Sequence, residues 1–165
     1  MKIMPKNNTF GYGRYLLSII FAMSLNITAW PQPMAPFNPN WILLVVIYWV
    51  LAAPERVGVF SAWTIGLLTD VLTGRMLGLN ALINSLVAFL CLRLHKRLRQ
   101  YPILQQGLFI FFCLLVSQFL IFWITDSQTI ARASYTFWLP VLTGTLFWPL
   151  VFFSLRAIRL FRRIR

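Results

Sequence analysis

Acidic side chains are so scarce in this 165-residue sequence that each can be weighed separately: they are Glu55, Asp70 and Asp126. Asp70 stands out because it closes an apolar run, where a carboxylate is costly unless it faces other polar protein groups. Carboxylates in such places relay ions, contact ligands or form bonds between helices. Asp70 is therefore the first candidate for a functional side chain.

A row of small residues leads up to Asp70. Gly58, Ala62, Gly66 and Asp70 recur every four residues, which places them on one face of a helix. Small side chains at this spacing let a second helix approach closely. We therefore expect a packing seam on this face, which ends at Asp70. Asn84 in the next apolar segment is a further member of this candidate partner or packing site.

The surroundings of Asp70 leave two interpretations open. The carboxyl-terminal end of a helix is electronegative, so an acid there needs compensation, and Arg75, Asn80 and Asn84 are the nearest candidates in the sequence. In the functional interpretation, Asp70 relays an ion, binds a ligand or contacts a membrane partner. In the structural interpretation, which we favour, it bonds to the glycine-containing turn Thr73–Gly78 and holds two helices together.

The other residue types that support catalysis form no recognisable pattern. The single histidine, His95, lies within a basic run, and Cys91 and Cys113 lie in apolar runs without the spacing of metal ligands. The sequence contains no zincin motif, no nucleophile elbow and no phosphate-binding loop. We therefore expect no enzyme, no metal and no cofactor, and a lipid-modifying enzyme is the least favoured alternative.

The composition indicates which solvent surrounds the elements that carry these residues. Apolar residues make up 59% of the chain and charged residues only 11%, and the mean hydropathy is +0.75. A soluble domain has about 25% charged residues, so this chain lacks the polar surface that water requires. We predict one all-α, polytopic integral membrane domain over residues 1–165, with a basic N-terminus at 1–14 and a basic tail at 156–165.

Six apolar segments are the predicted transmembrane helices. A full span needs about 20 residues. The second, third and fourth segments are shorter, so they must recruit flanking residues, thin the bilayer or pack inside the bundle. Five helices are the alternative count. The six segments lie at about 14–30, 41–53, 57–72, 78–92, 103–125 and 137–155.

The distribution of basic residues predicts an orientation with both termini in the cytoplasm. With the N-terminus inside, all of the 15 Lys and Arg residues except Arg75 and Arg132 fall in cytoplasmic segments, as the positive-inside rule requires. Four tryptophans support this orientation independently, because they fall at the predicted outer helix ends and indole rings favour the headgroup level. They are Trp30, Trp41, Trp123 and Trp138.

Two basic stretches are the candidate contact surfaces on the cytoplasmic side. The net charge of +12 could suggest nucleic acid, but the charges sit at the ends of apolar runs, which argues against it. The loop 93–100 and the tail 156–165 can instead lie along anionic headgroups, which is the favoured interpretation for the tail, or dock an acidic cytoplasmic protein. The candidate basic contacts are Arg93, Lys96, Arg97, Arg99, Arg159, Arg162 and Arg163.

The stretch Phe37–Trp49, which reads FNPNWILLVVIYW, resembles the MreD family of rod shape-determining membrane proteins. Members of this family are similar in having a Pro-Asn-Trp start to the second helix, an acidic residue that closes a Gly-x-x-x-Asp element, and a glycine-bearing turn before the fourth helix. The likeness is strongest over residues 37–85. It extends through Pro54–Gly58, Gly66–Asp70, Gly74, Leu77, Gly78, Trp148 and Pro149.

This resemblance implies a non-enzymatic inner-membrane scaffold of the bacterial cell-elongation complex, which supports cell shape and lateral peptidoglycan synthesis. It implies MreC, the MreB filament, and RodA with its partner transpeptidase as partners beside the lipid bilayer, with segments two to four as the expected contact region, and no small-molecule substrate. The family also looks similar to the six-helix substrate-binding components of vitamin-uptake transporters. The alternative function, motivated by Asp70 on its seam, is a small transport component that binds a ligand between helices.

Overall fold

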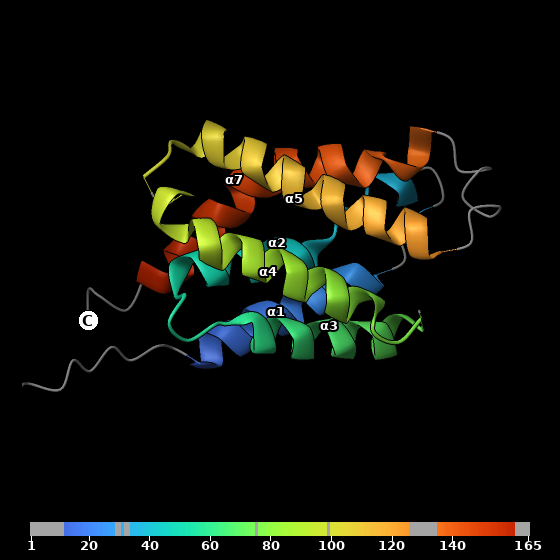
Figure 1. Cartoon of the computed structure of the whole chain (residues 1–165), viewed down its shortest axis with the longest axis horizontal. Helices are drawn as coiled ribbons and strands as arrows, with labels where there is room; N and C mark the ends of the chain where they lie inside the picture. The colour runs from blue at the N-terminus through green and yellow to red at the C-terminus, as the bar shows by residue number, and fades with distance from the viewer. Residues whose placement is uncertain are drawn as a thin grey trace, which may run out of the picture.

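The computed structural model describes residues 12–28, 31, 34–74, 76–98, 100–125 and 135–160, and within these ranges the chain forms helices and turns without a β-strand. Six α-helices and two short 3-10 helices follow one another (Figure 1). This architecture confirms the predicted all-α class. The elements are α1 Tyr12–Ile27, η1 Ala35–Phe37, α2 Trp41–Ala52, α3 Val59–Thr73, α4 Leu79–Leu98, α5 Ile103–Ile124, η2 Tyr135–Phe137 and α7 Leu139–Leu160.

The helix α4 is longer than the sequence predicts. The fourth apolar segment was expected to end near residue 92, yet α4 continues to Leu98, so most of the expected basic loop 93–100 is helical. Leu98 is buried against the core, and the side chain of Gln106 donates a 2.8 Å hydrogen bond to its carbonyl oxygen. Cations in the last turn also interact favourably with the helix dipole, so the basic run extends the helix.

The helix α2 occupies the centre of the bundle. In Figure 1, α5 and α7 lie along the top, α1 and α3 along the bottom, and α2 and α4 between them. Every residue from Ile42 to Leu51 is buried, because α2 packs against α1, α4 and α7. A helix that is apolar on all sides is stable only when it is enclosed. The short second segment therefore packs inside the protein, which is one of the three options that its length left open.

The outer faces of the peripheral helices are strongly apolar. Leu104 on α5 is 89% exposed and Leu146 on α7 is 77% exposed. Apolar surface of this extent is unfavourable in water and is solvated by the hydrocarbon of a bilayer. Among the residues that the structure describes, three stretches are long and apolar enough to cross a membrane, and α1 and α3 supply shorter apolar helices. The three are Ala35–Ala52, Ile103–Ile124 and Leu139–Ile158.

One end of the bundle is basic. The start of α1, the turn between α2 and α3, the end of α4 and the end of α7 lie together at the left of Figure 1. A 3.1 Å hydrogen bond from the guanidinium of Arg14 to the carbonyl oxygen of Ile158 joins the first helix to the last. We call this region the basic end. Its exposed cationic side chains are Arg56, Arg93, Lys96, Arg97 and Arg156.

The opposite end holds the α3–α4 turn, the end of α5 and the start of α7, and we call it the cavity end for the space described below. Asp70 is the only charged side chain at this end within the described part of the chain. Trp41, Trp123 and Trp138 also lie at this end, opposite the basic end, whereas Trp30 lies outside the described residues. These three tryptophans and the exposed cations therefore lie at opposite ends of the bundle, whereas Trp49 near the end of α2 and Trp63 near the start of α3 lie toward the basic end.

Candidate functional site

Asp70 lies in the last turn of α3 and is only 1% exposed. One carboxylate oxygen, Oδ1, accepts hydrogen bonds from the backbone N–H of Asn80 (2.9 Å) and from its side-chain Nδ2 (2.9 Å). The other, Oδ2, accepts from the backbone N–H groups of Gly78 (2.8 Å) and Ala81 (3.3 Å). A carboxylate has about four lone-pair sites, so these four donors occupy all of its capacity.

The donors that hold Asp70 belong to Gly78, which directly precedes α4, and to the first turn of α4, which begins at Leu79. The first N–H groups of a helix have no partner within that helix, and they carry its positive dipole end. Asp70 therefore caps α4 from the end of α3. This geometry also identifies the compensation that an acid at the end of α3 requires: backbone amides and Asn80 provide it. Arg75 lies outside the described residues.

Two glycines shape the turn that makes this cap possible. Gly74 ends α3 with φ +62°, and Gly78 has φ +98° just before α4. Both values lie in the left-handed region, which costs other residues free energy because of their Cβ atoms. The two glycines reverse the chain tightly enough to bring the first turn of α4 onto the carboxylate.

A very close backbone contact lies one helical turn before Asp70. A Cβ atom added to Gly66 would lie 2.4 Å from the Cα of Ala81 and 2.6 Å from the carbonyl oxygen of Asn80. Ala62, one further turn back, is fully buried. The face that carries these small residues therefore packs directly against α4, and α3 and α4 form the most extensive helix pair of the described bundle.

Two other members of the expected seam differ from Gly66 and Asp70. Gly58 precedes α3 as its N-cap residue, and nothing lies within 4 Å of a Cβ atom built on it. Its place in the four-residue series is therefore outside the close packing, because the helix starts only after it. Asn84 is 2% exposed on α4, but it makes no hydrogen bond to Asp70 in the part of the chain that the structure describes.

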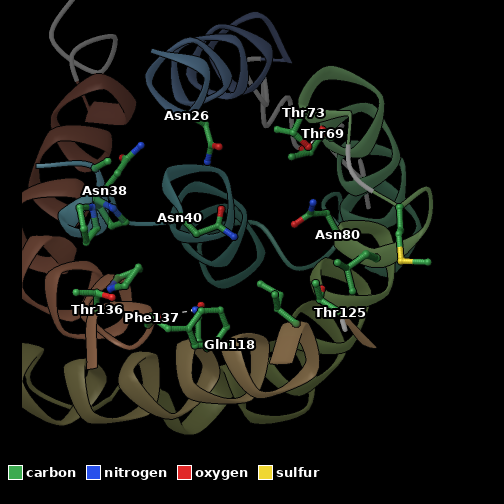
Figure 2. Close-up of a pocket in the computed structure, with 17 residues that line it drawn as sticks. Asn26, Asn38, Asn40, Thr69, Thr73, Asn80, Gln118, Thr125, Thr136 and Phe137 are labelled. Atoms are coloured by element: carbon green, nitrogen blue, oxygen red, sulfur yellow. Dashed lines mark hydrogen bonds between the residues drawn. The ribbon is translucent and has the colours of Figure 1, made fainter. Parts of the chain in front are cut away.

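A polar cavity of about 730 Å³ opens beside this cap at the cavity end. Figure 2 shows side chains from α1, α3, α4, α5 and the residues before α2 and α7 arranged around it. Apolar side chains and prolines form the rest of its described wall, and none of the lining residues that the structure describes is charged. Its polar lining residues are Asn26, Asn38, Asn40, Thr69, Thr73, Asn80, Gln118, Thr125 and Thr136.

From the sequence, a ligand site between helices near Asp70 was only the alternative prediction, and the residues that form the walls of this cavity were not predicted. Its walls come from five distant parts of the chain, and its amide side chains look like ordinary cap residues when each is considered alone. Asn40, for example, accepts a 3.2 Å hydrogen bond from the backbone N–H of Leu43 at the start of α2. The available signal was that Asn and Thr residues gather at those helix ends that share one side of the predicted topology.

The structure describes only some of the candidate basic contacts. Arg93, Lys96 and Arg97 are exposed on the last two turns of α4 at the basic end. Arg159 lies in α7, and its side chain is not among those described. The others, Arg99, Arg162 and Arg163, lie outside the described residues.

Comparisons with known proteins agree over most of the chain. The family model described as rod shape-determining protein MreD matches residues 8–158. A curated protein named rod shape-determining protein MreD, from Haemophilus influenzae (strain ATCC 51907 / DSM 11121 / KW20 / Rd), is 30% identical over 140 residues, which cover 85% of this chain and 86% of that protein. No solved structure matches.

Proposed function

Since this chain belongs to the MreD family of rod shape-determining proteins, we propose that it is a non-enzymatic inner-membrane scaffold of the bacterial cell-elongation complex. In this role it supports lateral peptidoglycan synthesis and thereby cell shape. The observation that carries the proposal is the family match over residues 8–158, which covers the described helices α1 to α5 in full and α7 as far as residue 158. The apolar exterior and the use of Asp70 as an internal cap support a packing role.

The proposed orientation places the basic end in the cytoplasm and the cavity end on the outer side. The exposed cations of the basic end support it, because positive residues are retained on the cytoplasmic side. Trp41, Trp123 and Trp138 at the other end suit the outer headgroup level. In this orientation the chain is one integral membrane domain with both termini inside.

The proposed partners are MreC and RodA with its transpeptidase in the membrane, and MreB at the cytoplasmic face. The short helices two to four were expected to bind partners, and for α2 that expectation needs correction, because α2 is enclosed by other helices from Ile42 to Leu51. The outer faces of α5 and α7 remain accessible to a membrane partner. The exposed cations on the last turns of α4 remain accessible to a cytoplasmic one.

Depletion of the protein in its rod-shaped host should convert rods into round cells within a few generations. The expected reason is loss of lateral wall synthesis while growth continues. Cell length-to-width ratios from phase-contrast microscopy measure the effect, and a plasmid copy of the wild-type gene serves as control. Rods of unchanged ratio after depletion to undetectable protein would refute the proposed function.

Neutralising the end of α4, by Arg93→Gln, Lys96→Gln and Arg97→Gln together, should lower co-purification of MreB severalfold without changing the amount of protein in the membrane. The reason is that exposed cations attract an acidic partner, an attraction that salt screens. Arg93→Lys with Arg97→Lys is the matched control, because it keeps every charge. If the neutralised protein instead fails to insert or inverts, these residues set topology alone and the docking proposal is wrong.

The alternative, a transport component with Asp70 as relay or ligand group, has weaker support. All four acceptor sites of Asp70 are occupied by groups of Gly78 and of the first turn of α4, and Gly66 packs against Ala81 so closely that no ligand fits between α3 and α4 there. The cavity beside this seam is the one observation in its favour. A ligand in that cavity would not use Asp70 as a binding group, because the acceptor sites of Asp70 are occupied.

A further inference from the structure

The cavity at the cavity end has the size of a small-molecule site. Its volume of about 730 Å³ falls within the roughly 300–1,000 Å³ that is usual for such sites. Figure 2 shows Asn26, Asn40, Asn80 and Gln118 reaching toward one common space from different elements. The cell-shape role does not require such a space, and packing alone would have filled it with apolar side chains.

The described wall of the cavity offers no charge to a ligand. None of the described residues that line it is acidic or basic, and the nearby Asp70 is enclosed by its four donors. Two helices begin at its wall, and side chains of the protein already accept hydrogen bonds from N–H groups in their first turns. Asn40 caps α2, and Asp70 caps α4. An ion of either sign would lose its hydration there without a counter-charge, so the site suits a neutral ligand.

Two amide side chains have their orientation fixed by the caps they form. The Nδ2 of Asn80 donates a 2.9 Å hydrogen bond to Asp70, which leaves the Oδ1 of Asn80 as an acceptor on the cavity wall. Asn40 uses its Oδ1 for the N–H of Leu43, which leaves its Nδ2 as a donor. Asn80 is only 4% exposed, and it lines the cavity.

A secondary amide matches this pair, because its carbonyl oxygen accepts from Asn40 and its N–H donates to Asn80. Gln118 donates its Nε2 to the carbonyl oxygen of Phe137 at 2.7 Å, so its Oε1 is a further acceptor, which suits a hydroxyl group. Threonine hydroxyls and the ring of Phe137 complete the wall. We propose that this cavity binds a neutral ligand that carries both a secondary amide and hydroxyl groups, in the manner of an N-acetylated sugar.

Ligand-observed NMR titration of the full-length protein in lipid nanodiscs tests this proposal without a sugar detergent that could compete. N-acetylglucosamine should bind saturably. Glucose, which has a hydroxyl in place of the amide, and glucosamine, which has a cationic amine there, should each bind about tenfold more weakly, because a polar group of the site is left unpaired. Equal binding of all three sugars, or no saturable binding of N-acetylglucosamine, would overturn the proposal.

Asn40→Asp is the most informative variant. Aspartate caps a helix as well as asparagine does, so α2 should stay intact, while the Nδ2 donor is lost and a charge enters the cavity. N-acetylglucosamine should bind at least about tenfold more weakly to this variant. Gln100→Glu makes the same chemical change at an exposed position outside the cavity and should leave binding unchanged.

Thr136→Val keeps the test decisive if Asn40→Asp does not fold. This substitution preserves the side-chain shape and removes one cavity hydroxyl, so N-acetylglucosamine should bind severalfold more weakly at an unchanged unfolding temperature. Unchanged binding in the folded variants Asn40→Asp and Thr136→Val would place the sugar elsewhere and overturn the assignment.

Discussion

Asp70→Ala is expected to lower the free energy of unfolding by about 3–5 kcal/mol, the usual cost of removing one partner from a buried charged arrangement. The substitution leaves the N–H groups of Gly78, Asn80 and Ala81 and the Nδ2 of Asn80 without their acceptor. Each buried donor without a partner costs about 1–3 kcal/mol, and bilayer hydrocarbon offers no replacement. Unfolding of the purified protein in detergent, followed by tryptophan fluorescence, measures the loss.

Two further variants identify the cause of this loss. Asp70→Asn keeps one oxygen acceptor but turns an NH₂ group toward an N–H donor, so it should cost about 2 kcal/mol. Glu55→Ala removes an exposed acid from the turn before α3 and should change stability by less than about 0.5 kcal/mol. A stability of Asp70→Ala within that margin of the wild type would contradict the capping role and reopen the functional interpretation of Asp70.

Gly66→Ala is expected to destabilise the protein by about 1–3 kcal/mol, although alanine normally favours a helix over glycine. The added Cβ would lie 2.4 Å from the Cα of Ala81, and backbone cannot move aside as a flexible side chain can. The two helices must separate, which also lengthens the bonds to Asp70. The same unfolding measurement checks this prediction.

Gly107→Ala in α5 is the matched control for this effect. Nothing lies within 4 Å of a Cβ atom built on Gly107, so alanine there should gain up to about 1 kcal/mol from helix propensity. The two substitutions are chemically identical and should have opposite signs. If both stabilise the protein, the close approach of α3 to α4 is not real.

Composition and periodicity were sufficient to predict much of this fold. The apolar runs predicted six helices, and each run coincides with one in the described residues. The spacing that ends at Asp70 places Ala62 and Gly66 on one helix face, because a period of four follows directly from helix geometry, and both residues are buried in the structure. It also included Gly58, since a period alone does not reveal where a helix begins.

Most of the hydrogen-bond donors to Asp70 could not be predicted from the sequence. Of the side chains that the sequence offered as compensating groups, Asn80 is confirmed, whereas Arg75 lies outside the described residues. The other three donors are backbone N–H groups, which every residue carries and which become available only because α4 begins at that point. The walls of the cavity could not be predicted for a similar reason, since they depend on how five chain segments meet in space.

Amide hydrogen exchange of the wild type and of Asp70→Ala tests most directly whether Asp70 locks α3 to α4. The amides of Gly78 and Ala81 should be protected in the wild type and should exchange at least about a hundredfold faster in the variant, since about 1.4 kcal/mol corresponds to a factor of ten. The amide of the buried Cys113 in α5 should stay protected in both. Equal exchange of Gly78 and Ala81 in the two proteins would contradict the account.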